Sequence, residues 1–327
     1  MSEYGFEAEG LVRRFGGTTA LDGVTLAAGR GRVLGLLGPN GAGKTTVIRI
    51  LATLLRPDAG RATVAGFDVA RDPARVRERI ALSGQHTGVD EELSGRANLV
   101  MIGRLLDLPR RRAEQRADEL LDRFGLGDAA GRPAAGYSGG MRRRLDLAAA
   151  LVGRPEAVFL DEPSAGLDPG RRDELWRMVR DLAADGATVL LTTQYLEEAD
   201  ALADAITVID GGRVIAAGAP AELKRRIGGH TIAVRLDDPA DAEPAAAILA
   251  AAAGRAPDRP SGTELAVPVD GDDAFYETAA RFRAQRIGVT ELSLRLPSLD
   301  EVFHALTGAR SDARSGSTPP DSVKAAR

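Results

Sequence analysis

A glycine-rich segment at residues 38–46, GPNGAGKTT, has the residue types and spacing of a phosphate-binding loop. From Gly38 it follows the pattern G-x-x-x-x-G-K-T, in which successive backbone N–H groups turn toward one point and surround phosphate oxygens. The glycines let the backbone turn tightly and approach a ligand closely. Lys44 can reach the outer phosphates, and the Thr45 hydroxyl can ligate Mg²⁺. The candidate nucleotide-binding residues of this segment are Gly38, Pro39, Asn40, Gly41, Ala42, Gly43, Lys44, Thr45 and Thr46.

The flanks of this segment predict the elements that must position it. Residues 32–37 form a short apolar run suited to a buried strand, and apolar residues recur at helical spacing over residues 47–55. Strand, loop and helix in this order place phosphate at a helix N-terminus, as the motif requires. Only three of the 43 lysine and arginine residues are lysines, and one of them is Lys44. A chance glycine turn before an ordinary helix is therefore disfavoured.

An acidic pair, Asp161 and Glu162, ends a second apolar run at residues 157–160. An aspartate in this place can hold Mg²⁺, directly or through water. A glutamate beside it can polarise an attacking water, as phosphoryl transfer to water requires. The alternative is a surface carboxylate pair that only caps a strand, which the phosphate loop in the same chain disfavours.

A second candidate anion site lies at Ser138, Gly139 and Gly140, which precede a predicted helix over residues 142–151. A serine hydroxyl and backbone N–H groups at a helix N-terminus attract anions. By itself the signal is weak, because Ser-Gly-Gly is a common way to begin a helix.

The arrangement of apolar runs predicts an α/β fold. Runs at residues 157–160 and 188–192, with a helical pattern between them at residues 171–182, indicate central strands of a mostly parallel sheet. Composition shifts near residues 228–229, so we expect one domain over 1–227, an α+β domain over 228–310 and a disordered polar tail over 311–327. The elements expected in the second domain are strand 231–236, helix 242–253, strand 263–269, helix 272–285, strand 289–296 and helix 299–307.

Bulk composition excludes several classes of protein. A net charge of −4 gives no support for a nucleic-acid-binding protein, and the absence of cysteine excludes disulfides and thiolate metal sites. The chain has no run of 18 apolar residues, and residues 1–10 lack the apolar core of a signal peptide. We therefore expect a cytoplasmic protein that does not itself span a membrane.

Five motifs in order over residues 6–226 make the chain resemble the ATP-binding subunit of ABC transporters. YSGGM is similar to the family signature, usually LSGGQ, and AVFLDE to the Walker B strand. Gln85, in SGQHTG, resembles the Q-loop glutamine that touches Mg²⁺ and senses the membrane partner. Phe15 occupies the place of the aromatic residue that stacks on adenine, although it could also be a core residue. The segment similar to the family D-loop consists of Ser164, Ala165, Gly166, Leu167 and Asp168.

The resemblance implies both a fold and a mechanism. The fold would be a P-loop NTPase of ABC type, with a mostly parallel core sheet, an antiparallel β subdomain and a helical subdomain, followed by the small α+β domain. Two copies would sandwich two ATP molecules, with Ser138, Gly139 and Gly140 of one copy contacting the γ-phosphate at Lys44 of the other. Thr45, Gln85 and Asp161 would serve Mg²⁺. Hydrolysis would drive a separate integral-membrane permease at the cytoplasmic face of the cell membrane.

The wording of several motifs is most similar to the bacterial drug-efflux subfamily typified by the daunorubicin-resistance ATPases. These motifs are GQHTGVDEELSGRANL, YSGGMRRRLDLA, TTQYLEEAD and, in the C-terminal domain, SLDEVFHALTG. An importer ATPase and a non-transport ATPase acting on nucleic acid or ribosomes remain alternatives. The short interval between Gln85 and Ser138 leaves no room for the coiled-coil insertion of DNA-repair relatives, and ribosome-acting relatives usually carry two cassettes.

Three positions depart from the family pattern or stay open. Gln194 stands where the family usually has histidine, so we expect it to orient the reacting groups beside the catalytic Glu162 without titrating near neutrality. Met141 replaces the signature glutamine but leaves Ser138 and both glycines in place. The amphipathic segment 298–306 either packs into its own domain or docks a partner.

Overall fold

The computed structural model describes residues 3–83, 88–227, 230–269 and 271–295. The chain divides into two compact units, Met1–Gly218 and Ala219–Arg327. The second unit thus begins with helix α8 (Pro220–Ile227), whereas the sequence predicts a first domain that extends to residue 227. The predicted helix 299–307 and the predicted disordered tail lie outside the described residues.

The first unit is built on a six-stranded sheet with the order β10-β9-β3-β8-β7-β6. All neighbouring strands are parallel except β9 and β10, which are antiparallel. Every residue of β3 and β8 is buried, which explains why both strands read as continuous apolar runs. The strands are β3 (Val33–Leu37), β6 (Ile80–Ser83), β7 (Ala157–Asp161), β8 (Thr188–Thr193), β9 (Ala205–Asp210) and β10 (Arg213–Gly218).

A second, antiparallel sheet of the first unit has the order β2-β1-β4-β5. Buried residues of β1, such as Phe6, Ala8 and Leu11, share one core with helix α1 and with Phe159 of β7. The rings of Phe6 and Phe159 meet edge to face at 5.8 Å, which joins the two sheets. The elements are β1 (Tyr4–Phe15), β2 (Thr18–Gly29), α1 (Lys44–Leu51), β4 (Ala59–Val64), β5 (Phe67–Asp68) and α2 (Pro73–Arg77).

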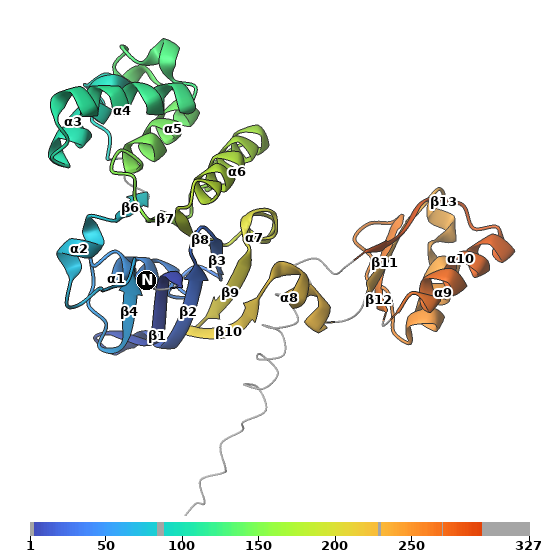
Figure 1. Cartoon of the computed structure of the whole chain (residues 1–327). Coiled ribbons are helices and arrows are strands. Elements are labelled where there is room, and N and C mark those ends of the chain that lie inside the picture. Colours follow the sequence, from blue (N-terminus) through green and yellow to red (C-terminus); the bar gives the residue numbers. More distant parts are fainter. Residues whose placement is uncertain (1–2, 84–87, 228–229, 270, 296–327) are drawn as a thin grey trace, which may run out of the picture. The chain divides into compact units, whose positions relative to one another are not determined.

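Helices α3, α4 and α5 form the green part of Figure 1, between β6 and β7 in the chain. Their apolar faces share a second core with β7, and that core includes Leu99, Leu120, Leu145 and Leu160. Helix α6 joins the same core through Leu175 and Trp176, and α7 joins it through Leu202. The helical elements are α3 (Gly95–Leu105), α4 (Arg110–Arg123), the 3₁₀ turns Gly127–Ala129 and Ala134–Gly136, α5 (Gly139–Ala150), α6 (Pro169–Ala184) and α7 (Leu196–Leu202).

The second unit is α+β. Its three-stranded antiparallel sheet has the order β12-β11-β13. Alternate residues of β11, Ile232, Val234 and Leu236, share a core with Leu249 of α9 and Phe282 of α10. The elements after α8 are β11 (His230–Leu236), the 3₁₀ turn Pro239–Asp241, α9 (Ala242–Ala253), β12 (Glu264–Val269), α10 (Asp273–Gln285) and β13 (Val289–Arg295). Among the described residues of both units, no helix has the length and apolar character needed to cross a membrane.

Candidate functional site

The glycine-rich loop connects β3 to α1, as the sequence predicted. Its last residue, Gly43, is the N-cap of α1 and adopts a left-handed conformation with φ of 108°. No side chain in the described part of the chain caps this helix. The first backbone N–H groups of a helix have no partner within the helix, so the start of α1 can offer them to an anion.

Two of the loop glycines are required by close contacts. A Cβ atom at Gly38 would lie 2.2 Å from the carbonyl oxygen of Ile209, at the end of β9. A Cβ atom at Gly43 would lie 2.7 Å from the carbonyl oxygen of Ala20, in addition to straining its left-handed backbone. The loop is therefore packed against β9 and β2 on one side, which holds its backbone in place.

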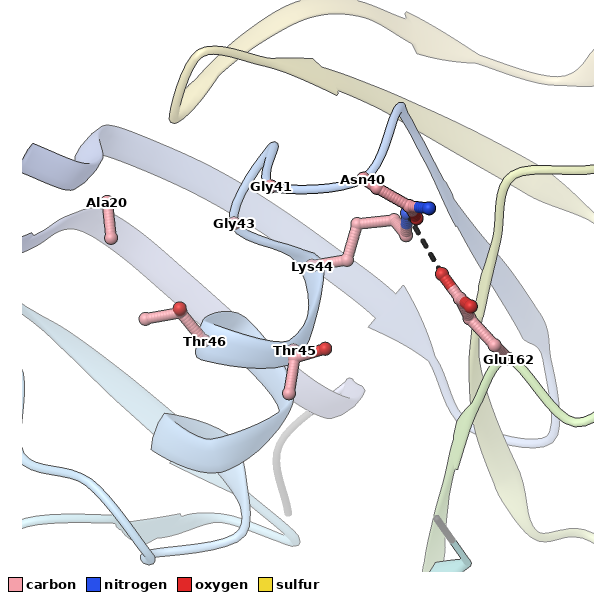
Figure 2. A pocket seen from close by; sticks show the side chains of 8 residues that line it. All are labelled: Ala20, Asn40, Gly41, Gly43, Lys44, Thr45, Thr46 and Glu162. Carbon is pink, nitrogen blue, oxygen red and sulfur yellow. Dashed lines mark ion pairs between the residues drawn. The ribbon is translucent and has the colours of Figure 1, made fainter. Parts of the chain in front are cut away.

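Lys44 is the best-buried charged group of the site, with 4% of its surface exposed. Its ammonium group donates to the carbonyl oxygens of Gly38, at 2.7 Å, and Pro39, at 3.2 Å. It also forms an ion pair with Glu162, with 3.2 Å between Nζ and Oε1. Figure 2 shows the two side chains meeting across the pocket. The lysine is thus folded back over the loop that it follows.

Thr45 and Asp161 bring a hydroxyl and a carboxylate together. Thr45 Oγ1 lies 3.4 Å from Asp161 Oδ1, and the hydroxyl of Thr192 donates to the same carboxylate oxygen at 2.6 Å. Hard oxygen donors of this kind suit Mg²⁺, which takes one or two protein ligands together with substrate phosphates and water. The donor set therefore fits a magnesium ion held between α1 and the end of β7.

Glu162 has a strained backbone. Its φ is 50°, in the left-handed region that non-glycine residues seldom adopt. Its backbone N–H donates to both the carbonyl oxygen and the hydroxyl oxygen of Thr192, at 3.1 and 3.0 Å. Such strain persists only where surrounding contacts hold it, and it is common at functional sites. Thr192 of β8 therefore orients Asp161 and Glu162 together.

The residues around Lys44 enclose a cavity of about 310 Å³. Glu162 faces this cavity from the opposite side (Figure 2). The cavity is lined by Ala20, Asn40, Gly41, Gly43, Lys44, Thr45, Thr46 and Glu162. Sequence reasoning missed two contributors, the lining residue Ala20 and the orienting residue Thr192. Thr192 could have been found by pairing the two predicted central strands, because it is the register partner of Asp161.

The D-loop segment and Gln194 both follow ends of neighbouring strands. Ala165 N–H donates to the Glu162 carbonyl at 3.2 Å, so the segment turns directly after the acidic pair. Asp168 caps α6 by accepting from Arg171 N–H at 3.1 Å. Gln194 is exposed and comes directly after β8, beside β7. It is not among the residues that line the cavity.

Phe15 lies at the end of β1 with 47% of its surface exposed, so the alternative of a core aromatic residue does not hold. The Arg13 guanidinium lies 4.9 Å from the centre of its ring. An exposed ring of this kind is available for stacking. Gln85 lies outside the described residues.

The signature segment does not contribute to the cavity at Lys44. Ser138 is the N-cap of α5, and its Oγ accepts from Met141 N–H at 3.3 Å. Gly139 and Gly140 form the first turn, and a Cβ atom at Gly140 would lie 3.2 Å from Arg171 Cδ. None of these three predicted residues lines the cavity at Lys44.

The chain is similar to known ATP-binding proteins along most of its length. The family model described as ABC transporter matches residues 21–165. The daunorubicin resistance ATP-binding protein DrrA2 of Streptomyces coeruleorubidus is 52% identical over 95% of this chain and 98% of the relative. The doxorubicin resistance ATP-binding protein DrrA of Mycobacterium tuberculosis is 47% identical over 89% of each chain.

A solved structure supports the fold. CbiO1 of Clostridium perfringens, part of the ABC transporter complex CbiONQ, superposes with a TM-score of 0.63 and is 28% identical. The match covers 69% of this chain and 95% of that structure. The predicted mixed α/β fold with a parallel core is confirmed. The extent of these matches shows that this chain belongs to the ABC transporter family as an ATP-binding subunit.

Proposed function

We propose that the chain hydrolyses ATP at the cavity around Lys44 and thereby drives export of a drug or another small hydrophobic compound through a separate permease. The observation that carries the proposal is the convergence of Lys44, Thr45 and Glu162 on one cavity, with the Asp161 carboxylate 3.4 Å from the Thr45 hydroxyl. The transported class is supported by the relatives, whose names describe resistance to daunorubicin and doxorubicin.

Each residue has a part in the proposed reaction. The loop N–H groups and Lys44 bind the β- and γ-phosphates. Thr45 and Asp161, with Gln85, would hold Mg²⁺, which would neutralise charge on the phosphate oxygens. Phe15 stacks on the adenine.

Glu162 accepts a proton from water, whose oxygen attacks the γ-phosphorus while the bond to the ADP oxygen breaks. Gln194 orients the attacking water or the γ-phosphate through its amide. Because glutamine does not titrate near neutral pH, it takes no proton in this step.

Two copies complete the site in this proposal. Lys44 is buried in its own cavity, whereas Ser138, Gly139 and Gly140 lie outside it at the N-terminus of α5. We infer that these residues, with the D-loop from Ser164 to Asp168, close over ATP bound to a second copy. The unit after Gly218 acts as an accessory domain, and the assembly sits at the cytoplasmic face of the membrane.

The catalytic role is tested by Glu162→Gln in the full chain, with Glu78→Gln as control because Glu78 is 69% exposed and pairs only with Arg79 among the described residues. We expect Glu162→Gln to bind ATP and to lose turnover by roughly 10²-fold or more, since a positioned base contributes 10²–10⁴. If the Glu162→Gln variant retains turnover, Glu162 is not the general base. If the wild-type chain binds no ATP, the cavity around Lys44 is not an ATP site.

The transport role is tested in cells that express the chain together with a candidate membrane permease. Wild-type chain should lower accumulation of a fluorescent anthracycline, and Glu162→Gln should not. Equal accumulation in both strains, with ATPase activity intact in the purified wild type, would contradict export of this compound class.

A further inference from the structure

The exposed ring of Phe15 has a cation against one of its faces. The Arg13 guanidinium lies over the ring, with its central carbon 4.9 Å from the ring centre. The Arg13 Nε–H is buried and has no hydrogen-bond partner among the described residues, and the electron-rich face of an aromatic ring compensates such a group. The ring still has 47% of its surface exposed, so the guanidinium covers only part of it.

A carboxylate fixes the position of this guanidinium. Asp58 lies in the loop between α1 and β4. Arg13 Nη1 donates to Asp58 Oδ1 at 2.7 Å and to the carbonyl oxygen of Arg56 at 3.1 Å. Asp58 Oδ2 accepts from Arg14 N–H at 2.7 Å, and Asp58 N–H donates to the Val12 carbonyl at 2.8 Å. Asp58 therefore attaches both the Arg13 side chain and the backbone at the end of β1 to the loop that follows α1.

The end of β1 also lies beside the part of β2 that reaches the phosphate cavity. Arg13 pairs with Leu21, and Arg14 pairs with Thr19. Ala20 is thus an extra residue of β2 between the two pairs, and it lines the cavity. When the phosphates of a nucleotide occupy this cavity, we expect its base near the end of β1.

We propose that Arg13, held by Asp58, is a positioning residue for adenine. It covers one face of the Phe15 ring, so that the base of ATP stacks on the other face. The inference rests on the proposed function, in which Phe15 stacks on the adenine. A ring at the end of a strand, without this support, would rotate about its side-chain bonds and lose that freedom when the base binds. The cation removes this cost in advance, because it holds the ring in one orientation.

Two other roles for Arg13 predict different results. As a positive charge near the cavity, it would attract any anionic ligand, with or without a base. As a group that only joins β1 to the loop after α1, it would affect the stability of the chain without a preference between ligands. A role at the Phe15 ring depends on the base. Ligands with and without adenine therefore separate the three roles.

The experiment measures dissociation constants of ADP and of inorganic tripolyphosphate, each with Mg²⁺, by isothermal titration calorimetry on the full chain. The variants are Arg13→Ala, Phe15→Ala and the double variant that combines them. Arg14→Ala is the matched control, because it removes the same charge from an exposed neighbouring position. The contact of Arg14 with Asp58 is made by its backbone N–H, which alanine keeps.

We expect the loss of affinity to be confined to the ligand with a base. Phe15→Ala should weaken ADP binding by roughly 10- to 100-fold, as removal of a stacking side chain does. Arg13→Ala should weaken it by about 3- to 10-fold, in the range of a cation at a partly exposed ring. Tripolyphosphate should bind every variant within about twofold of wild type, and Arg14→Ala should bind both ligands within the same limit.

The double variant tests whether Arg13 acts through the ring. If it does, adding Arg13→Ala to Phe15→Ala should change the affinity for ADP by no more than about twofold. Single effects that multiply fully in the double variant would overturn the proposal.

The remaining outcomes are equally decisive. The proposal is overturned if Arg13→Ala leaves ADP binding unchanged, if it weakens ADP and tripolyphosphate equally, or if Arg14→Ala weakens ADP as much. In each case a loss of ADP affinity in Phe15→Ala leaves the proposed function intact. If Phe15→Ala binds ADP as the wild type does, the stacking role in the proposed function is wrong, and the role of Arg13 is wrong with it. A wild-type chain that binds neither ligand contradicts the ATP site itself.

Discussion

Two helices of the first unit begin with glycine-rich segments, and they begin differently. At α1, Gly43 adopts a left-handed conformation and no described side chain caps the helix. At α5, Ser138 is extended and its hydroxyl accepts from Met141 N–H. The start of α1 thus leaves its N–H groups to a ligand, whereas α5 satisfies one of them internally.

The ion pairs beside the two helices also differ in their burial. Lys44 and Glu162 pair at 4% and 19% side-chain exposure inside a cavity. Arg171 and Asp168, next to α5, pair at 48% and 55% exposure. Exposed pairs contribute little free energy, and buried charges depend strongly on their partners. The α1 site therefore forms within one chain, whereas the charged pair next to α5 is open to solvent.

The largest expected effect is that of Lys44→Ala on the α1 side. Removing a preorganised cationic donor from a phosphate site should lower kcat/KM for ATP by roughly 10²- to 10³-fold. Lys224→Ala, in α8, is the control. Steady-state phosphate release measures the effect. A decrease in kcat/KM of less than tenfold would show that Lys44 is not what makes the start of α1 a phosphate site.

Thr192→Val should have the next largest effect, because it removes the hydroxyl that orients Asp161 and accepts from Glu162 N–H. Supporting residues of this kind typically change metal affinity by about 10- to 100-fold. We expect a matching increase in the Mg²⁺ concentration needed for half-maximal turnover. An unchanged Mg²⁺ requirement would contradict the assignment of Asp161 to the metal.

The matched pair Gly43→Ala and Gly139→Ala tests the backbone difference directly. Gly43→Ala meets both a left-handed φ and a carbonyl oxygen at 2.7 Å, so it should lower the free energy of unfolding by about 1–3 kcal/mol. At Gly139 the nearest atom is 3.9 Å from an added Cβ, so Gly139→Ala should have little effect. Denaturant unfolding measures both, and equal destabilisation would break the comparison.

Ser138→Ala should have only a small effect on the stability of the single chain. Loss of a serine cap lowers stability by about 1 kcal/mol, and ATP binding at Lys44 should persist. The substitution should have a larger effect on ATP turnover by a dimer. A mixture of Lys44→Ala and Ser138→Ala chains should turn over faster than either alone, because a mixed dimer contains one intact composite site. A mixture no faster than its parents would count against a shared site.

The sequence predicted those parts of the site that depend on local order along the chain. The expected strands at 157–160 and 188–192 correspond to β7 (Ala157–Asp161) and β8 (Thr188–Thr193), because a strand buried on both faces needs a continuous apolar run. In the second unit, the expected strand 231–236 and helix 242–253 correspond to β11 and α9.

The remaining features depend on which elements lie next to each other. Ala20 lines the cavity because β2 passes beside the loop, which no local pattern reveals. Thr192 matters because parallel pairing sets it opposite Asp161. Glu198 looks like an ordinary surface residue in LEEAD, and only the packing of α7 against Trp176 shows that it is buried.

Because Lys44 forms an ion pair with Glu162, nucleotide binding exchanges one anionic partner of this lysine for another. A phosphate that takes the ammonium group must displace a carboxylate that already holds it at 3.2 Å. The displaced carboxylate is the group proposed to activate water, so occupancy of the loop and release of the base become a single event. On this view the affinity for ATP reflects the difference between two free energies. One is that of phosphate binding to Lys44, and the other is that of the Glu162 carboxylate binding to the same lysine.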